Sequence, residues 1–488
     1  MSTLQLGKAS KNYLTAQPYV KMMRDTVTGV PALKAPENAT TYLPKIDCDD
    51  EQDAEYQRTK YQRILKQAEY NNVPSRTLSA LQGGLSYRDN NFEGVPSELE
   101  YLLDDIDGDG LTANELIKIV QSELLQVKYC GLLAEYSDLE SLGIDEDEQL
   151  TITQKNALGL RASIKLYSRE SIVNWDFKRI NGRRQLSWVL LREVEQDKDP
   201  LQFSCDDVET YVLLSLDDDG NYNQRRWVEG EAKQAGGWSD AVYPEKSGGM
   251  LFSYIPFEFV IEGDYPKGDI PLALGYLFEI AGLTLHRYQM SACYKSALHY
   301  MATPKTWSSG WDNQGFEFYK SMTGRDYISV ADDAHLPLPK DGQYGILDWK
   351  ASDTAYRDYF DSNAAEIEAQ GGTFDIQENS GEQTATAKVI NAAEKTSVLS
   401  NVQSTIETAL IKLMTYCADF EGREADVDIK LNREFIAIKL SPQERDAIRN
   451  DYGQGLITRE EALKQLEQGG VLVGKAEELL VELEMNGQ

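Results

Sequence analysis

The longest apolar stretch of the chain runs from Ile270 to Met301, and almost every position in its first half is apolar. Pro271 suits a first helical turn, and Pro304 follows the end of the pattern. As one helix the stretch would be roughly 45 Å long. Three ionisable residues interrupt it and exclude a membrane span: Glu279, His286 and Arg287. Since a helix that is apolar on nearly every face must be buried on several sides, the pattern predicts either a central core helix or a helix packed between copies of itself.

Four further segments repeat apolar residues at helical spacing. They cover residues 49–72, 75–83, 352–370 and 384–420, and the last predicts one long helix. Residues 1–50 are dotted with prolines and are expected to form an extended arm with one short helix. The last fifty residues contain two capping boxes, Ser441–Glu444 and Thr458–Glu461, which predict small helices.

Between residues 162 and 256 the apolar period shifts toward two, which is typical of β-strands. Turn signals at Asn181-Gly182 and Asp219-Gly220 divide this region, and the second predicts a β-hairpin. Residues 303–349 have no clear period and are expected to be irregular or to contain β-structure. Residues 427–440 resemble a further hairpin. The fold class predicted from these segments is α+β.

An aspartate-rich turn precedes the helical pattern that begins near residue 113. Three aspartates followed by a glycine match the first half of an EF-hand calcium loop: Asp105, Asp107, Asp109 and Gly110. The match fails at the twelfth position, where Leu116 replaces the bidentate glutamate. The alternative is a tight turn followed by a capping box, with Thr112 as N-cap and Glu115 three residues later. Calcium therefore remains only a weak candidate, and no other metal site is predicted.

The chain is strongly acidic, with 80 acidic and 49 basic residues and a formal net charge of −31 over 488 residues. Because 41% of the residues are hydrophobic and 10% aromatic, this is not the composition of a disordered polyanion. The charge argues against tight binding of nucleic acid by phosphate neutralisation. It is compatible with a surface that repels DNA and lets it slide past. Residues 137–150 form an especially acidic segment, expected to be a solvated loop.

Few residues are available for zinc sites or histidine-based catalysis, and the abundant carboxylates show no distinctive spacing. The five cysteines are scattered without a CxxC motif, and only three histidines are present. The first residues contain no apolar core of a secretory signal, so we expect a protein made in the cytoplasm and not exported. There is no GxxxxGK[ST] loop, GxSxG elbow or HExxH motif. The sequence predicts neither an enzyme nor a bound cofactor.

Ten short stretches, in this order, together resemble the portal proteins of tailed bacteriophages, in particular a subfamily long catalogued as a domain of unknown function. They are Tyr42-Leu43-Pro44-Lys45, Glu55-Tyr56-Gln57-Arg58, Arg76-Thr77, Asp105-Ile106-Asp107-Gly108, Gly131-Leu132-Leu133, Ser171-Ile172-Val173-Asn174-Trp175, Leu191-Arg192-Glu193, Ile255-Pro256-Phe257, the long helix ending at Pro304, and Ser380-Gly381-Glu382-Gln383-Thr384-Ala385-Thr386-Ala387. The chain departs from the family pattern at residues 137–150, which are longer, and in residues 303–349, which match loosely.

The resemblance implies a division of the chain into the parts of a portal subunit. They are an N-terminal arm (1–48), a wing (49–269), a first stem helix (270–302), a clip (303–350), a second stem helix (351–370), a channel loop (371–383), a long wing helix (384–421) and a crown (422–488). Such subunits form a ring, usually of twelve, at one vertex of the capsid. Apolarity on every face of a stem helix is expected there, because each helix has neighbours on both sides.

The resemblance also implies site residues and partners. The channel loop would face DNA through Gly372, Thr373, Phe374, Asp375, Gln377 and Asn379. Stem helices of neighbouring subunits would meet through Leu274, Leu277, Phe278 and Leu285, and partners would dock on the clip at Trp307, Trp311 and Phe316. The implied partners are further copies of the chain, double-stranded DNA in transit, the major capsid protein, the terminase packaging motor and head-completion or tail-adaptor proteins, all in the virion, with no membrane.

Two other functions remain compatible with the sequence. Another ring-forming structural protein of the virion would share the acidity and the helix burial, but not the order of stem, clip and stem. A calcium-binding enzyme would rest on the loop of Asp105 to Asp109.

Overall fold

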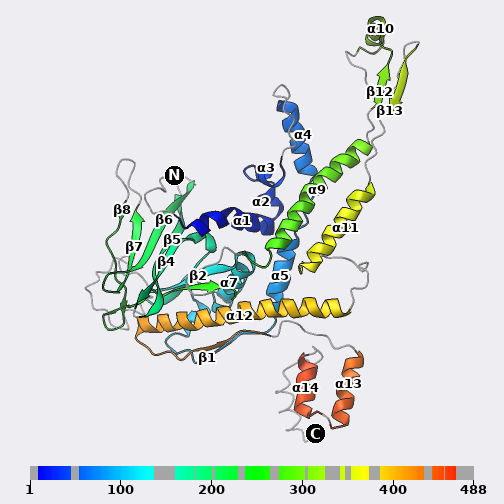
Figure 1. Ribbon diagram of the computed structural model, residues 1–488. Coiled ribbons are helices and arrows are strands. Elements are labelled where there is room, and N and C mark those ends of the chain that lie inside the picture. Colours follow the sequence, from blue (N-terminus) through cyan, green and yellow to red (C-terminus); the bar gives the residue numbers. More distant parts are fainter. Residues whose placement is uncertain are drawn as a thin grey trace. The chain divides into compact units, whose positions relative to one another are not determined.

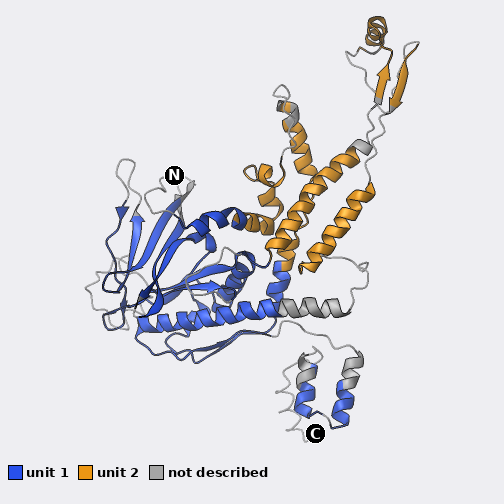
Figure 2. Ribbon diagram, in the orientation of Figure 1, with its two compact units in different colours: residues 1–20, 78–276, 381–488 blue, residues 21–77, 277–380 orange. Residues whose placement is uncertain are grey.

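The computed structural model describes residues 9–44, 54–136, 160–180, 182–199, 204–228, 237–263, 274–302, 306–324, 341–346, 353–372, 385–433, 442–455 and 457–468. The chain divides into two compact units, which Figure 2 colours separately. Unit 1 contains residues 1–20, 78–276 and 381–488, and unit 2 contains residues 21–77 and 277–380. The fold is α+β, as the sequence predicts.

Unit 1 contains a five-stranded antiparallel sheet in the order β4-β5-β6-β7-β8 (Figure 1). Its strands are Ile172–Ile180, Arg183–Asp199, Ser204–Leu216, Tyr222–Val228 and Gly237–Trp238. The predicted hairpin is confirmed: β6 turns into β7 at Asp217, whose Oδ1 accepts hydrogen bonds from the backbone N–H groups of Asp219 (3.0 Å) and Asn221 (2.8 Å). Gly220 has a φ of +85°, which explains why a glycine stands there.

A second sheet of unit 1 has the order β11-β2-β3, from Phe257–Ile261, Tyr129–Tyr136 and Ala162–Tyr167. Helix α12, Ala385–Glu421, contacts this sheet and α7, Ala113–Val127. The core between them consists of buried aliphatic side chains, among them Leu116, Val120, Leu132, Val402, Ile406 and Leu413. The 37 residues of α12 confirm the predicted long helix.

The remaining elements of unit 1 are short. They are α6 (Tyr101–Asp104), a 3-10 turn (Arg169–Ser171), β9 (Glu245–Lys246), β10 (Met250–Leu251), α13 (Pro442–Gly453), α14 (Arg459–Gln468), and the antiparallel pair of β1 (Asn91–Glu93) with β14 (Asp428–Lys430). The capping box of Thr458 and Glu461 is present at the start of α14. Strand β14 pairs with β1, a segment distant in the sequence. The second half of the hairpin expected over 427–440 lies outside the described residues.

Unit 2 is organised around α9, Phe278–Ala302. Helix α4, Ala54–Gln67, and helix α11, Asp353–Ala369, both contact it. A cluster of buried side chains joins α9 to the N-terminal segments: Leu33, Tyr42, Leu43, Ala68, Leu285, Tyr288 and Ala292. Between α9 and α11 the chain forms β12 (Thr306–Ser309), α10 (Asn313–Thr323) and β13 (Gln343–Ile346), with the two strands paired antiparallel.

Two boundaries differ from the sequence prediction. The first fifty residues, expected to form an extended arm with one short helix, contain α1 (Lys11–Thr28), α2 (Val30–Leu33) and α3 (Ala39–Tyr42), and α1 accommodates Pro18. Helix α5, predicted over 75–83, covers Val73–Leu85. Helix α9 begins at Phe278 and not at Ile270. The reason lies at Gly275, where a Cβ atom would stand 2.5 Å from the carbonyl oxygen of Gln126, so the chain passes too close to the end of α7 for a side chain to fit.

Candidate functional site

Helices α9 and α11 form an antiparallel pair, which Figure 1 shows side by side in green and yellow. Asn363 Nδ2 donates to the carbonyl oxygen of Leu283 (3.2 Å), and Arg287 Nη1 donates to the carbonyl oxygen of Phe360 (2.7 Å). Towards the other end of the pair, Tyr294 Oη donates to Asp353 Oδ1 (2.8 Å). Because residue numbers rise along α9 as they fall along α11, the two helices run antiparallel.

Burial of α9 is explained largely by its own unit. The side chains at Leu277, Ala281, Thr284, Tyr288 and Ser291 are buried and recur every three to four residues. The exposed positions form the opposite stripe: Glu279, His286, Cys293, Leu298 and His299. The helix is therefore apolar on several faces because it packs against α4, α11 and the N-terminal segments at once.

The four predicted stem contacts fall into two groups. Leu277 is fully buried and Leu285 is 7% exposed, the latter inside the cluster of unit 2. Leu274 and Phe278 are half-buried and have area left for another molecule to cover. A role for any of the four at a subunit contact stays a prediction.

The residues between α9 and α11, which are predicted to form a clip, make a small module with its own core, and we call it the clip module. Trp311 packs edge-on against the buried Tyr319 at 5.6 Å between ring centroids, and its Nε1 donates to Ser308 Oγ (2.9 Å). The indole of Trp307 lies over the opposite strand, where a Cβ atom on Gly345 would stand 2.6 Å from its Nε1. The helix of the module was not predicted. It begins at an N-cap, Asp312, and ends at Gly324 in the left-handed region.

Apolar side chains of the clip module are exposed. Trp307 is 43% exposed, while the predicted Phe316 is half-buried and Trp311 lies in the small core. The most exposed members were missed by the sequence analysis: Phe318 at 61% and Met322 at 66%. Their spacing of four places them on one face of α10, a signal that a helix prediction for 313–323 would have revealed.

The predicted channel loop begins where α11 ends. Gly371 has a φ of +83°, and the backbone N–H of Gly372 donates to the carbonyl oxygen of Ile367 (2.9 Å), which closes the helix. The side chains predicted to face DNA lie outside the described residues: Thr373, Phe374, Asp375, Gln377 and Asn379. The acidic segment 137–150 also lies outside them.

The aspartate-rich turn is held together by its own carboxylates. Asp105 Oδ1 accepts hydrogen bonds from the backbone of Gly108 and Gly110, both at 2.9 Å, and its Oδ2 pairs with Arg161. Asp107 Oδ1 accepts from Asp109 (2.9 Å) and Leu111 (3.1 Å). These contacts are those of a tight turn closed by its own side chains. No group of three acidic, histidine or cysteine side chains able to hold a metal ion occurs in the part of the chain that the structure describes.

The capping box predicted after this turn is present. Thr112 Oγ1 accepts from the backbone of Glu115 (3.2 Å), and the Glu115 carboxylate accepts from the backbone of Thr112 (2.9 Å). Hydrogen bonding to Thr112 lowers the pKa of the Glu115 carboxyl below its usual value.

Several stretches that carry the family resemblance meet in space. Gly131 on β2 lies under the ring of Phe257 on β11, and a Cβ atom at Gly131 would collide with that ring. Ile172 pairs with Leu191 across β4 and β5. In unit 2, Gln289 on α9 donates to the carbonyl oxygen of Tyr42 (3.0 Å). Stretches that are distant in the sequence are therefore in contact in the folded chain.

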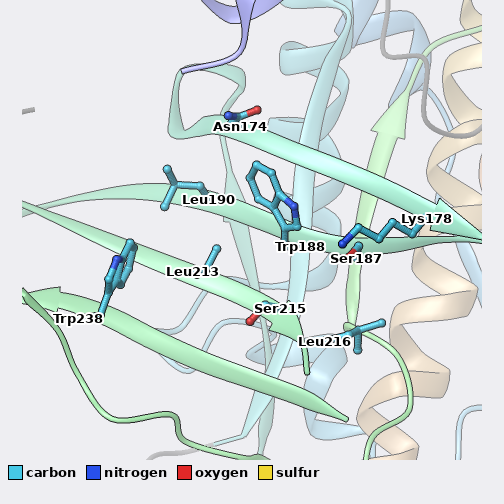
Figure 3. A pocket seen from close by; sticks show the side chains of 9 residues that line it. All are labelled: Asn174, Lys178, Ser187, Trp188, Leu190, Leu213, Ser215, Leu216 and Trp238. Atoms are coloured by element: carbon cyan, nitrogen blue, oxygen red, sulfur yellow. The ribbon is translucent and has the colours of Figure 1, made fainter. Parts of the chain in front are cut away.

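A groove on the five-stranded sheet was not predicted. Its volume is about 360 Å³, and Figure 3 shows the side chains that line it: Asn174, Lys178, Ser187, Trp188, Leu190, Leu213, Ser215, Leu216 and Trp238. They come from β4, β5, β6 and β8. Two tryptophans and three leucines make the groove largely apolar, and Lys178 supplies its charged side chain.

An ion cluster joins the two sheets of unit 1. Glu193 on β5 accepts hydrogen bonds from Lys165 Nζ (2.7 Å) and Tyr167 Oη (2.6 Å) on β3, and Arg226 Nη1 lies 3.6 Å from its other oxygen. Burial raises the pKa of Glu193, but these partners outweigh it and hold the pKa below its usual value. Burial raises the pKa of the neighbouring Glu135.

Comparisons with known proteins give one partial family match. Residues 276–421 match a family model described as a domain of unknown function, DUF4055. The matched segment begins two residues before α9 and ends with the last residue of α12, so the helix pair, the clip module and the long helix recur together. No curated protein sequence matches the chain.

Three solved structures contain chains similar to this one, each at 12% identity. They are described as the virion of a native gene transfer agent (GTA) particle, the neck of a native GTA particle computed with C12 symmetry, and the neck of an empty GTA particle computed with C6 symmetry. The TM-scores are 0.41, 0.39 and 0.39. The matches cover 84%, 85% and 89% of this chain and 92%, 93% and 97% of the others. Within the described residues, no helix has the length and apolarity needed to cross a membrane.

Proposed function

We propose that the chain is a portal protein: a structural subunit that assembles into a ring at one vertex of a phage-like capsid and lets double-stranded DNA pass. The ring would dock the terminase motor and later the adaptor proteins of the tail, and it would sit in the major capsid protein's shell. It would have no catalytic role.

The observation that carries this proposal is the order of elements between residues 278 and 421. An antiparallel helix pair, α9 and α11, brackets a small module with its own core, and a 37-residue helix follows. The family resemblance implies this order of first stem helix, clip, second stem helix and long wing helix. A different ring-forming virion protein would have no reason to repeat it.

The charge of the chain supports a conduit over a DNA-binding role. At −31 per subunit, a ring repels the phosphate backbone, so DNA would pass without adhering. The same charge opposes assembly, because neighbouring subunits repel one another. Subunit contacts must therefore be extensive or locally complementary in charge.

The test is the mass of the purified protein in solution, measured by light scattering across salt and protein concentration. The proposal expects a ring near 660 kDa, twelve times the chain mass of 54.9 kDa, or a neighbouring ring number. A species that stays at the mass of one chain across salt, concentration and divalent ions would contradict it.

A further inference from the structure

The end of the β4–β5 hairpin carries a cluster of basic residues, although the chain as a whole is acidic. Four of the seven residues 178–184 are basic and none is acidic; we call this segment the basic hairpin tip. Lys178, Arg179, Arg183 and Arg184 are all exposed. Within the described chain, Arg192 and Arg226 of the same sheet have acidic partners, whereas no ion pair is formed by Lys178, Arg179 or Arg183.

The strand register brings two of these basic residues together. Arg179 lies directly opposite Arg184 in the antiparallel pair. Like charges that face each other across two strands destabilise the pair. An anionic partner at the basic hairpin tip would remove that repulsion.

The opposite arrangement occurs at the pair of β1 and β14. Glu93 lies directly opposite Asp428. Residues 91–100 and 423–430, which we call the acidic strip, contain six acidic and two basic residues, a net charge of −4. All six acidic residues are exposed: Glu93, Glu98, Glu100, Glu424, Asp426 and Asp428. Arg423 pairs with Glu98 (3.2 Å) and Lys430 with Asp428 (2.6 Å), which leaves four carboxylates in excess.

We propose that the basic hairpin tip of one copy docks on the acidic strip of a second copy. This inference rests on the proposed ring, since a head-to-tail contact between identical subunits brings two different surfaces together. The net charges of the two surfaces are equal and opposite. The contact offsets locally the repulsion between subunits of charge −31.

A protein partner fits this surface better than nucleic acid does. Lys178 belongs both to the basic hairpin tip and to the apolar groove, so the basic charge continues into a surface with Trp188 and Trp238. A duplex offers a polyanionic backbone that a chain of charge −31 repels at longer range, and it has no apolar surface for the groove. A second copy offers both acidic and apolar side chains.

The experiment exchanges the charges of the two surfaces. The hairpin variant carries Arg179→Glu and Arg184→Glu, and the strip variant carries Glu93→Arg and Asp428→Arg. Each keeps a like-charge pair across its strands, but Arg184→Glu removes the contact with the Phe177 ring and Asp428→Arg removes the ion pair with Lys430. Thermal unfolding of both variants is therefore measured first, and association is compared at a temperature where each is folded. We expect either variant to lower the association constant by about tenfold or more in sedimentation velocity, and the combined variant to recover to within about threefold.

The combined variant has the natural net charge, which separates a specific contact from general repulsion. Lys11→Glu with Arg225→Glu is the matched control for the hairpin variant, because both residues are exposed in unit 1 and the net charge changes equally. This control is expected to associate within about threefold of the natural chain. Unchanged association of either reversed variant, or no recovery in the combined one, would overturn the proposal while the ring stands.

A duplex of about 30 base pairs, followed by fluorescence anisotropy at low salt, tests the alternative occupant. The proposal expects the hairpin variant to bind this duplex as weakly as the natural chain does. DNA binding that is lost in the hairpin variant, with assembly unchanged, would assign the tip to nucleic acid. A natural chain that never assembles would instead refute the proposed ring itself, before any variant is compared.

Discussion

Asn363 on α11 donates a hydrogen bond from Nδ2 to the backbone carbonyl oxygen of Leu283 on α9, at 3.2 Å, and its side chain is 5% exposed. Its Oδ1 is also buried and has no hydrogen-bond partner among the described residues. A buried amide with one bond made and one oxygen unpartnered is retained at a cost in stability. Asn363 sets the alignment of the two helices, because its hydrogen bond fixes which turn of α11 faces which turn of α9.

Replacement of Asn363 by alanine should weaken this helix pair. We expect Asn363→Ala to lower the free energy of unfolding by about 1–2 kcal/mol, from the lost hydrogen bond and the space left in a buried position. Thermal and urea unfolding followed by circular dichroism would measure the change. Ser362→Ala, at the exposed neighbouring position, is the control and should change stability by less than about 0.5 kcal/mol. Equal effects of the two substitutions would contradict a register role for Asn363.

The aspartate-rich turn is expected to be stabilised by the hydrogen bonds and the ion pair of Asp105, and not by calcium. Burial raises the pKa of the Asp105 carboxyl, but the backbone of Gly110 and Gly108 and the Arg161 guanidinium together hold it below its usual value. A depressed carboxyl pKa stabilises the fold above the unfolded value of about 3.9, and this contribution is lost as the pH falls through the folded pKa. Asp105→Asn should therefore lower the melting temperature at pH 7, and this effect should shrink as the pH falls below about 3.9.

Isothermal titration separates this structural role from a metal site. We expect no heat from calcium at millimolar concentration, because the carboxylates already bond the loop and Arg161. Thr112→Ala, which removes the N-cap of α7, should cost about 1 kcal/mol with or without calcium. A melting temperature that rises on addition of calcium and no longer does so in Asp105→Asn would restore the EF-hand interpretation.

The sequence predicts best where one periodic signal is long. The 37 residues of α12 and the 17 of α11 match their predicted spans within a residue or two, because the apolar spacing persists over many turns. Failures occur where tertiary contacts override a local signal. Pro18 suggested an extended arm but lies inside α1, and the close approach at Gly275 delays α9 to Phe278. The groove was not predictable, because its lining comes from four strands whose register no local pattern reveals.

Glu135 is expected to destabilise the fold at neutral pH. Burial raises its pKa, and the Glu193 charge adds to this while Lys165 and Arg226 oppose it. Below about pH 4.3, the unfolded value, both states are protonated and the residue has no effect. As the pH rises from there through the folded pKa, the wild type loses stability that Glu135→Gln retains. Melting temperatures between pH 4 and pH 8 should thus diverge in favour of Glu135→Gln.

A control for this pH dependence is Glu209→Gln, which removes an exposed carboxylate on β6 of the five-stranded sheet. Its melting curve should stay parallel to that of the natural chain over the same range. If Glu135→Gln is less stable than the natural chain at pH 7, Lys165 and Arg226 stabilise the Glu135 carboxylate by more than burial destabilises it, and the pKa of Glu135 is not raised.

Deletion of the predicted channel loop should separate assembly from DNA passage. Removal of Thr373–Asn379 leaves Gly371 and Gly372, which close α11, in place. We expect rings of unchanged mass with impaired DNA packaging or retention, measured as the DNA content of particles assembled in vivo. Replacement of the same seven residues by a glycine-serine linker controls for chain connectivity. Loss of the ring in the deletion would argue that the loop is part of a subunit contact and does not line the channel.

Residues Leu277 and Phe278 are neighbours in sequence, but aspartate should have opposite consequences at the two positions. Leu277→Asp buries a charge at a fully buried site and is expected to prevent folding, so a loss of rings in that variant carries no information on assembly. Phe278 is half-buried at the first turn of α9, where an acidic side chain favours the helix dipole. Phe278→Asp should therefore fold, with circular dichroism unchanged, yet associate at least about tenfold more weakly if a neighbouring subunit covers this position. Thr415→Asp, exposed on α12, is the control of equal charge. Normal assembly of a folded Phe278→Asp protein would remove this residue from the stem contact and confine the apolar character of α9 to the packing of its own subunit.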